Sequence, residues 1–229
     1  VLIHPAWDRG AEKYQTANFE AVRSHLKNPA ALAEQIVAEV SCGLSVTRNQ
    51  LNRALAQTLG GSQKLLPGIN QTIREMCEAE LLVEKVDSDK PKAGLILRAT
   101  KAGRVAARHM LMPSTVLKLK KVLHQIPEST FFDLLVLLCS VTDCEPVIQV
   151  DFEELDSLAS GLANEPSYLL RCSAKDLQDL LDISSRRLLS TLKMAWVARQ
   201  YTRLGCMEST ASLSDCYPYE IVRLTESLD

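Results

Sequence analysis

Apolar residues recur at helical spacing through most of this chain and at strand spacing in one short stretch. Leu32, Ile36 and Val40 repeat every fourth residue and form one apolar stripe. The exceptions are residues 81–86 and 95–100, two apolar runs of strand length that flank the polar turn DSDKPKAG. The chain is therefore expected to be mainly α, with a single β-hairpin.

The order of these elements predicts two domains after a short leading segment. Three helices followed by a β-hairpin, over residues 27–113, predict a winged-helix domain. After Pro113 the pattern becomes all-α, so residues 114–229 are expected to form a helical bundle. Residues 1–26 read as a short buried strand, VLIHP, and a polar helix or linker. A lone strand needs a sheet, so the chain is interpreted as a piece of a larger protein.

Helices are predicted throughout the second half by their spacing and by polar residues that precede them. The expected helices cover residues 114–125, 129–142, 152–164, 174–181 and 185–204. In the first half, one helix runs from Pro29 to a stop at Cys42 and Gly43, and two more cover 47–57 and 67–79. Gly60 and Gly61 are expected to stop the second of these three helices. Thr47 with Gln50 reads as a capping box, and Ser114 is expected to cap the helix that follows the proline break.

Positive charge is unevenly distributed along the chain. Residues 27–113 carry 12 Lys or Arg against 8 Asp or Glu, a balance of +4, whereas residues 114–229 carry 11 against 17, a balance of −6. Within that acidic half, the stretch from Ile183 to Met207 holds five basic residues and no acid: Arg186, Arg187, Lys193, Arg199 and Arg203. A basic island on an acidic domain predicts a local contact with phosphate.

Several classes of chemistry are not indicated. The chain has no G-x-x-x-x-G-K-[ST] loop, no D-E-x-H box and no H-E-x-x-H or G-x-S-x-G motif, so neither nucleotide hydrolysis nor other catalysis is expected from it alone. Its seven cysteines are scattered without a C-x-x-C pair, which indicates neither a zinc site nor a disulfide framework and favours an intracellular location, in cytoplasm or nucleus. No apolar run reaches membrane-spanning length.

Two basic helical faces are candidate binding sites. Lys101, Arg104 and Arg108 lie at i, i+3 and i+7, so one face would contact phosphate or an acidic protein surface. In the longest predicted helix, Trp196, Arg199 and Arg203 share the same spacing. The Trp196 ring would either stack on a nucleic-acid base or belong to the core.

The segment LRATKAGRVAARHMLMPSTVLKL carries a resemblance to a known family. It resembles the T-x-x-G-R motif, with Thr100, Gly103, Arg104 and then Pro113, of Ski-type superfamily 2 helicases, especially the HelQ and PolQ-like lineage with its archaeal relatives. In that class, the motif ends a winged helix and leads into a helical domain. The VLIHP segment would then be the tail of the second RecA-like motor domain, and the similarity would span most of the chain.

The resemblance implies further roles. Such helicases place a long ratchet helix across the unwound strand, and residues 185–204 are the corresponding segment here. The family usually carries an arginine about two turns before the tryptophan, whereas this chain has Leu189, so Arg187 or Lys193 would have to substitute. The winged helix would pack mostly on the motor. Its third helix carries Glu75 and Glu78, which disfavours sequence-specific reading of a DNA groove.

The sequence therefore predicts an accessory nucleic-acid-binding region of an ATP-dependent helicase, monomeric and without a membrane segment. Its partners would be single-stranded DNA or RNA and the RecA-like domains of the parent protein. This region is expected to need no cofactor, whereas the parent would use ATP and Mg²⁺. Two alternatives remain open: a winged-helix transcriptional regulator with a helical dimerisation or sensing domain, and a winged-helix scaffold that binds only proteins.

Overall fold

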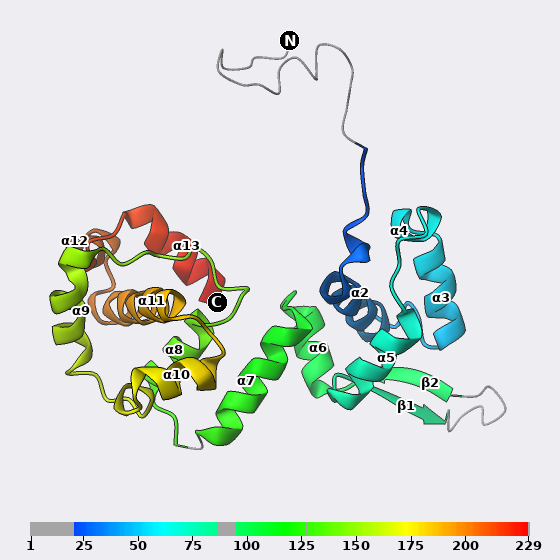
Figure 1. Ribbon diagram of the computed structural model, residues 1–229, viewed down its shortest axis with the longest axis horizontal. Helices are drawn as coiled ribbons and strands as arrows, with labels where there is room; N and C mark the ends of the chain where they lie inside the picture. The colour runs from blue at the N-terminus through cyan, green and yellow to red at the C-terminus, as the bar shows by residue number, and fades with distance from the viewer. Residues whose placement is uncertain (1–20, 87–94, 127, 229) are drawn as a thin grey trace, which may run out of the picture.

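The structure, a computed structural model, describes residues 21–86, 95–126 and 128–228. It is mainly helical and has two lobes, with α6 (Lys101–Arg108) and α7 (Pro113–Gln125) lying between them in Figure 1. The fold class predicted from the sequence, mainly α, is confirmed at this level. The predicted strand VLIHP and the turn DSDKPKAG lie outside the described residues, as does most of the predicted linker.

The first lobe contains a helical group and one hairpin. Its elements before α6 are η1 (His25–Lys27), α2 (Pro29–Ser41), α3 (Arg48–Ala56), α4 (Leu59–Ser62), α5 (Ile69–Glu78), β1 (Leu82–Val86) and β2 (Leu95–Ala99). The hairpin is antiparallel, and its register pairs Leu82 with Ala99 and Val86 with Leu95. The backbone N–H of Leu97 also donates to the carbonyl oxygen of Val46 at 2.9 Å, so the segment before α3 lies against β2.

Local sequence explains where these helices begin. Asn28 accepts a hydrogen bond from the N–H of Ala30 and precedes Pro29, which loses nothing at a first helical position. The Thr47 side chain caps α3 by accepting from Gln50 N, while Gln50 Oε1 accepts from Val46 N instead of from the cap residue. In the predicted capping box, the Gln50 side chain therefore bonds the backbone of Val46, one residue before the expected partner, Thr47.

The second lobe is all helical and is organised around α11. Its elements after α7 are α8 (Phe131–Cys139), η3 (Phe152–Glu154), α9 (Leu155–Leu162), η4 (Leu169–Arg171), α10 (Ala174–Leu181), α11 (Ser185–Leu204), α12 (Met207–Ser214) and α13 (Pro218–Leu228). Figure 1 shows α11 in the middle of this lobe, and α8, α9, α10, α12 and α13 all pack against it. Gly205, in the left-handed conformation at φ 62°, ends it.

Some predicted boundaries were wrong. Helix α8 stops at Cys139 rather than Thr142, and the segment before α9 is a short 3-10 turn. Ser114 does not cap α7, because Pro113 already occupies the first helical turn and Met112 stands at the cap without a side-chain hydrogen bond. Gly60 and Gly61 lie inside the short helix α4 instead of ending a helix.

Buried apolar side chains form two separate clusters. The first spans residues 32–116, with Leu32, Ile36 and Leu51 at its centre, and the second spans residues 122–224. Helix α7 contributes Val116 to the first cluster and Val122 to the second. One continuous helix therefore belongs to both cores.

Candidate nucleic-acid interface

The start of α6 is built by Thr100 and Gly103. The Thr100 hydroxyl donates to the Glu80 carbonyl oxygen at 2.7 Å and accepts from the N–H of Gly103 at 3.2 Å, so it ties α6 to the start of β1. A Cβ on Gly103 would lie 2.1 Å from the carbonyl oxygen of Leu81. Only a residue without a side chain permits this approach. The close contact fixes the orientation of α6 here, and with it the direction in which the side chain of the next residue, Arg104, points away from the helix axis.

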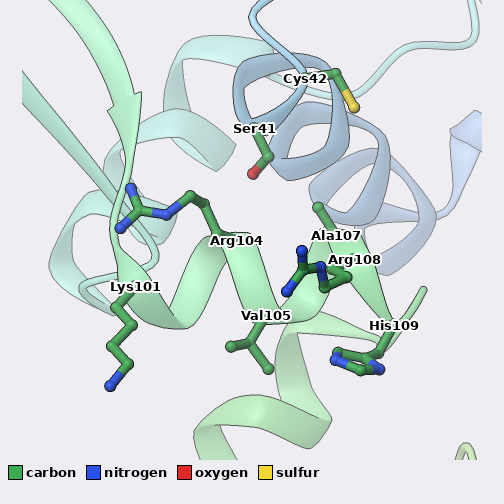
Figure 2. Close-up of a pocket in the computed structure, with 8 residues that line it drawn as sticks. All are labelled: Ser41, Cys42, Lys101, Arg104, Val105, Ala107, Arg108 and His109. Carbon is green, nitrogen blue, oxygen red and sulfur yellow. The ribbon is translucent and has the colours of Figure 1, made fainter.

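A groove of about 490 Å³ opens beside α6, where α2 ends. Figure 2 shows the basic side chains of α6 on one side of it and the end of α2 on the other. The lining residues are Ser41, Cys42, Lys101, Arg104, Val105, Ala107, Arg108 and His109. The structure thus places all three basic residues predicted for this helix along one groove.

The charges of this groove are mostly unopposed. Arg104 donates from one guanidinium nitrogen to the Ala99 carbonyl oxygen at 2.9 Å, which leaves its other N–H groups available. Within the described ranges, no carboxylate forms an ion pair with Lys101, Arg104 or Arg108. The groove is therefore a positively charged, solvent-open surface that a phosphate could enter without displacing a protein anion.

Lys193, on α11, is in a different situation. Its side chain is only 4% exposed, and its ammonium group forms an ion pair with Glu154. The same nitrogen also donates to the carbonyl oxygen of Asp215 at 3.4 Å. This lysine bridges α11 to the segments before α9 and after α12, so its charge is used inside the protein.

The arginines of α11 are also largely engaged by protein groups. Arg187 donates to the carbonyl oxygens of Cys139 and Val141, both at 3.1 Å, where α8 ends. Arg199 and Arg203 share the carboxylate of Glu165, at 3.3 and 2.8 Å respectively.

The first residues of α11 are the exception. Arg186 is exposed, and the described part of the chain offers it no carboxylate within ion-pair distance. Leu189, which stands where the resembled family carries an arginine, is also exposed, at 41%. Among the α11 cations, Arg186 is therefore the one that has no ion-pair partner or carbonyl contact in the described residues.

Trp196 packs against a neighbouring helix. A Cβ on Gly161, in α9, would lie 2.7 Å from the indole nitrogen Nε1, so the ring edge rests directly on the α9 backbone. The ring is partly buried against the second core. The structure thus favours the core alternative for this side chain over base stacking.

Five of the eight lining residues of the α6 groove were not predicted, among them Ser41, Cys42 and His109. Ser41 and Cys42 come from the end of α2, about sixty positions before α6 in the chain, and His109 follows α6 directly. In the sequence, the one indication that any of these residues would line the groove was that His109 directly follows Arg108. The α2 contribution depends on tertiary packing, which the spacing of basic residues does not encode.

Comparison with known proteins gave no match: no protein-family model and no curated protein sequence matches this chain. Within the described ranges, no three His, Cys, Asp or Glu side chains are placed to share a metal ion. In the same residues, every helix is too short or too polar to cross a membrane.

Proposed function

We propose that this chain is an accessory nucleic-acid-binding region of an ATP-dependent superfamily 2 helicase, and that it contacts the phosphates of single-stranded nucleic acid through the α6 groove. The observation that carries this proposal is the groove itself, where Lys101, Arg104 and Arg108 line one opening with no ion-pair partner in the described residues. Unpaired cations along a groove are the basic requirement for binding a sugar-phosphate backbone.

The helicase assignment rests on the resemblance around Thr100, Gly103 and Arg104. Two observations support it. Thr100 and Gly103 each have a structural role, since the hydroxyl ties α6 to the start of β1 and the glycine allows the close approach to Leu81. The helices α2, α3 and α5, with the short α4 between the last two, precede the β1–β2 hairpin in the order of a winged helix, and one backbone hydrogen bond from Leu97 links the two-stranded sheet to Val46.

A sequence-reading regulator is less well supported. Its recognition helix would be α5, where Gln71 bonds to Glu75 and to Arg74 along the helix surface. These polar groups satisfy one another, and the exposed carboxylates would repel a phosphate backbone. The groove beside α6 has neither feature, so non-specific backbone contact is the function that the geometry supports best.

ATP and Mg²⁺ belong to the proposed parent protein. The resemblance assigns them to the RecA-like motor, and the sequence of this chain has no loop that could cradle a triphosphate. The proposed contribution of this region is therefore to hold the strand, while the motor supplies the movement.

Binding of a fluorescently labelled oligothymidylate at several salt concentrations tests the proposal. The double variant Lys101→Ala/Arg108→Ala should bind about tenfold more weakly at low salt, and the slope of log affinity against log salt should fall by about 1.4, at about 0.7 per lost phosphate contact. A matched control, Lys121→Ala/Lys175→Ala, removes two exposed lysines outside the groove and the same total charge. Equal losses in both variants, or no binding by the unmodified chain, would contradict the proposal.

A further inference from the structure

A buried carboxylate joins two distant segments on the surface of the second lobe. Asp133, which is 1% exposed, accepts hydrogen bonds from the backbone N–H of Thr130 at 2.8 Å and of Tyr168 at 3.2 Å, both on the same oxygen Oδ2. Its other oxygen accepts from Leu169 N at 3.0 Å and from the Ser167 hydroxyl. The backbone at the start of α8 is therefore held directly beside the backbone of residues 167–169.

This junction presents two aromatic rings to solvent. Phe131 follows Thr130 and is 49% exposed, and Tyr168 is 40% exposed. Each ring carries a guanidinium group above it: Arg199 lies 5.3 Å from the centre of the Phe131 ring, and Arg171 lies 5.3 Å from that of Tyr168. Two aromatic side chains, each paired with an arginine, thus start from adjacent backbone segments.

A second buried carboxylate orients the arginines. The Glu165 side chain is 1% exposed and accepts from both Arg199 and Arg203, while the Arg203 side chain stays 45% exposed. One carboxylate for two guanidiniums leaves positive charge at the surface, and the exposed Arg171 adds to it. The opposing group is Glu128, which accepts a hydrogen bond from the Tyr168 hydroxyl at 2.8 Å. With Asp133 and Glu165 counted, three carboxylates match the three arginines, but these two carboxylates are buried. The exposed charged groups beside the rings are Arg171, Arg203 and Glu128, two cations against one carboxylate.

We infer that Phe131, Tyr168, Arg171, Arg199 and Arg203 form an aromatic platform on which unpaired nucleotides stack. Bases would lie on the exposed faces of the two rings, and the adjacent phosphates would lie against Arg171 and Arg203. The inference rests on the proposed function and deepens it, because it locates base contacts on rings larger than the imidazole of His109, and the lining of the α6 groove has no Phe, Tyr or Trp.

The physical argument for unpaired nucleotides has two parts. Every base has a π-face, so stacking on an aromatic ring binds single strands without regard to sequence, whereas the bases of a duplex are already stacked on each other. Asp133 also fixes the backbone from which Tyr168 starts, and Glu165 holds Arg199 and Arg203, so part of the ordering cost is met before a strand binds. A protein partner would contact the same arginines. Binding of normal and abasic strands distinguishes such a partner from nucleic acid.

The test compares a normal and an abasic strand of equal length and charge. Phe131→Ala/Tyr168→Ala should weaken binding of a 12-nucleotide oligothymidylate at least tenfold, by loss of base stacking, and should leave the weaker binding of the abasic strand within twofold. The groove variant Lys101→Ala/Arg108→Ala should instead weaken both strands. Phe152→Ala/Tyr219→Ala removes two exposed aromatic rings outside the platform and should change neither.

Further variants keep the test independent of folding. Tyr168→Phe retains the ring but loses the hydroxyl bond to Glu128, and it should bind oligothymidylate as tightly as the unmodified chain. Glu128→Gln removes the negative charge beside the rings and should strengthen binding about twofold or more at low salt. Thermal unfolding of each variant verifies that it is folded.

Each outcome has a distinct meaning. If the unmodified chain binds oligothymidylate, and the groove variant weakens it while the platform variant does not, the inference is overturned and the proposed function stands. Equal losses by the platform variant on the normal and abasic strands would also overturn it, because stacking would then not be the interaction lost. No binding by the unmodified chain would overturn both.

Discussion

Helices α6 and α11 both carry basic residues at helical spacing but use them differently. Helix α6 places three cations at i, i+3 and i+7, and α11 places Trp196, Arg199 and Arg203 at the same spacing. Helix α6 lies at the edge of the first lobe with its basic face along an open groove, whereas α11 lies in the middle of the second lobe and is surrounded by other helices (Figure 1). The cations of α6 remain available, and most of those of α11 bind protein oxygens.

The difference shows that helical spacing predicts which residues share a face but not what that face meets. The buried charged side chains of the described residues are Asp133, Glu165 and Lys193, and all three belong to the second lobe. A central helix has to pair its buried charged groups internally, since leaving a buried charge unpaired costs several kcal/mol. Positive charge on such a helix is therefore partly structural.

The largest expected effect is at Lys193. Lys193→Ala should lower the free energy of unfolding by about 3 kcal/mol, because it leaves the mostly buried carboxylate of Glu154, 13% exposed, without its partner. Lys101→Ala, on α6, should change it by less than about 0.5 kcal/mol. Urea denaturation measures both. Lys120→Ala, which breaks the exposed ion pair with Glu80, is the control and should cost at most about 1 kcal/mol. Similar losses in all three variants would remove the distinction between the helices.

A smaller effect is expected from Asp133 at low pH. Burial acts to raise the pKa of its carboxyl, but hydrogen bonds from Ser167, Leu169 and Thr130 outweigh burial and lower the pKa below its ordinary value. The carboxylate thus contributes stability above about pH 4, and the contribution is lost as the pH falls through the lowered pKa.

Asp133→Asn should therefore destabilise the second lobe by about 2–3 kcal/mol at pH 7 and by progressively less as the pH falls below about 4. Unfolding in urea across this pH range measures the difference between the two proteins. A difference that does not change with pH would mean that the charge of the carboxylate contributes nothing to the junction.

The smallest effects are expected from substituting Gly103 or Gly161, the two glycines at which a helix packs closely against a neighbouring segment. Gly103→Ala should cost about 2 kcal/mol, because the new methyl group meets the Leu81 backbone, which has to move together with α6. Gly161→Ala meets the Trp196 side chain instead and should cost about 1 kcal/mol.

Fluorescence separates these two cases. In a Trp7→Phe background, where Trp196 is the sole tryptophan of the chain, Gly161→Ala should shift the emission spectrum and Gly103→Ala should not. Gly68→Ala is the control, because its methyl group would meet ordinary contact at 3.6 Å. An unshifted spectrum for Gly161→Ala would contradict the packing of Trp196 on α9.

The local parts of the fold were predictable from the sequence. Apolar spacing with capping residues gave the bounds of α10 and α11, and strand-length apolar runs gave both strands of the hairpin to within a residue. Helices α12 and α13 were not predicted. Both are short, and α12 is rich in serine and threonine, so their helical form depends on packing against α11.

The two candidate sites also differ in how far the sequence predicts them. The basic face of α6 was predictable because its three cations belong to one helix. The aromatic platform was not, since Phe131 and Tyr168 are 37 positions apart and meet only through Asp133, a residue that reads from the sequence as a simple helix-cap partner. Long-range hydrogen bonds to a single buried side chain leave no periodic signal.

Helix α7 links the lobe that carries the α6 groove to the lobe that carries the proposed aromatic platform. Val116 and Val122 anchor one continuous helix in two cores, about 9 Å apart along its axis. The N–H of Met112 and the Nζ of Lys118 add hydrogen bonds to Asp143 and Ser140 on the second lobe. Rotation of one lobe against the other would have to bend this helix or move Val116 or Val122 within its core. Helix α7 therefore couples the orientation of the first lobe to that of the second.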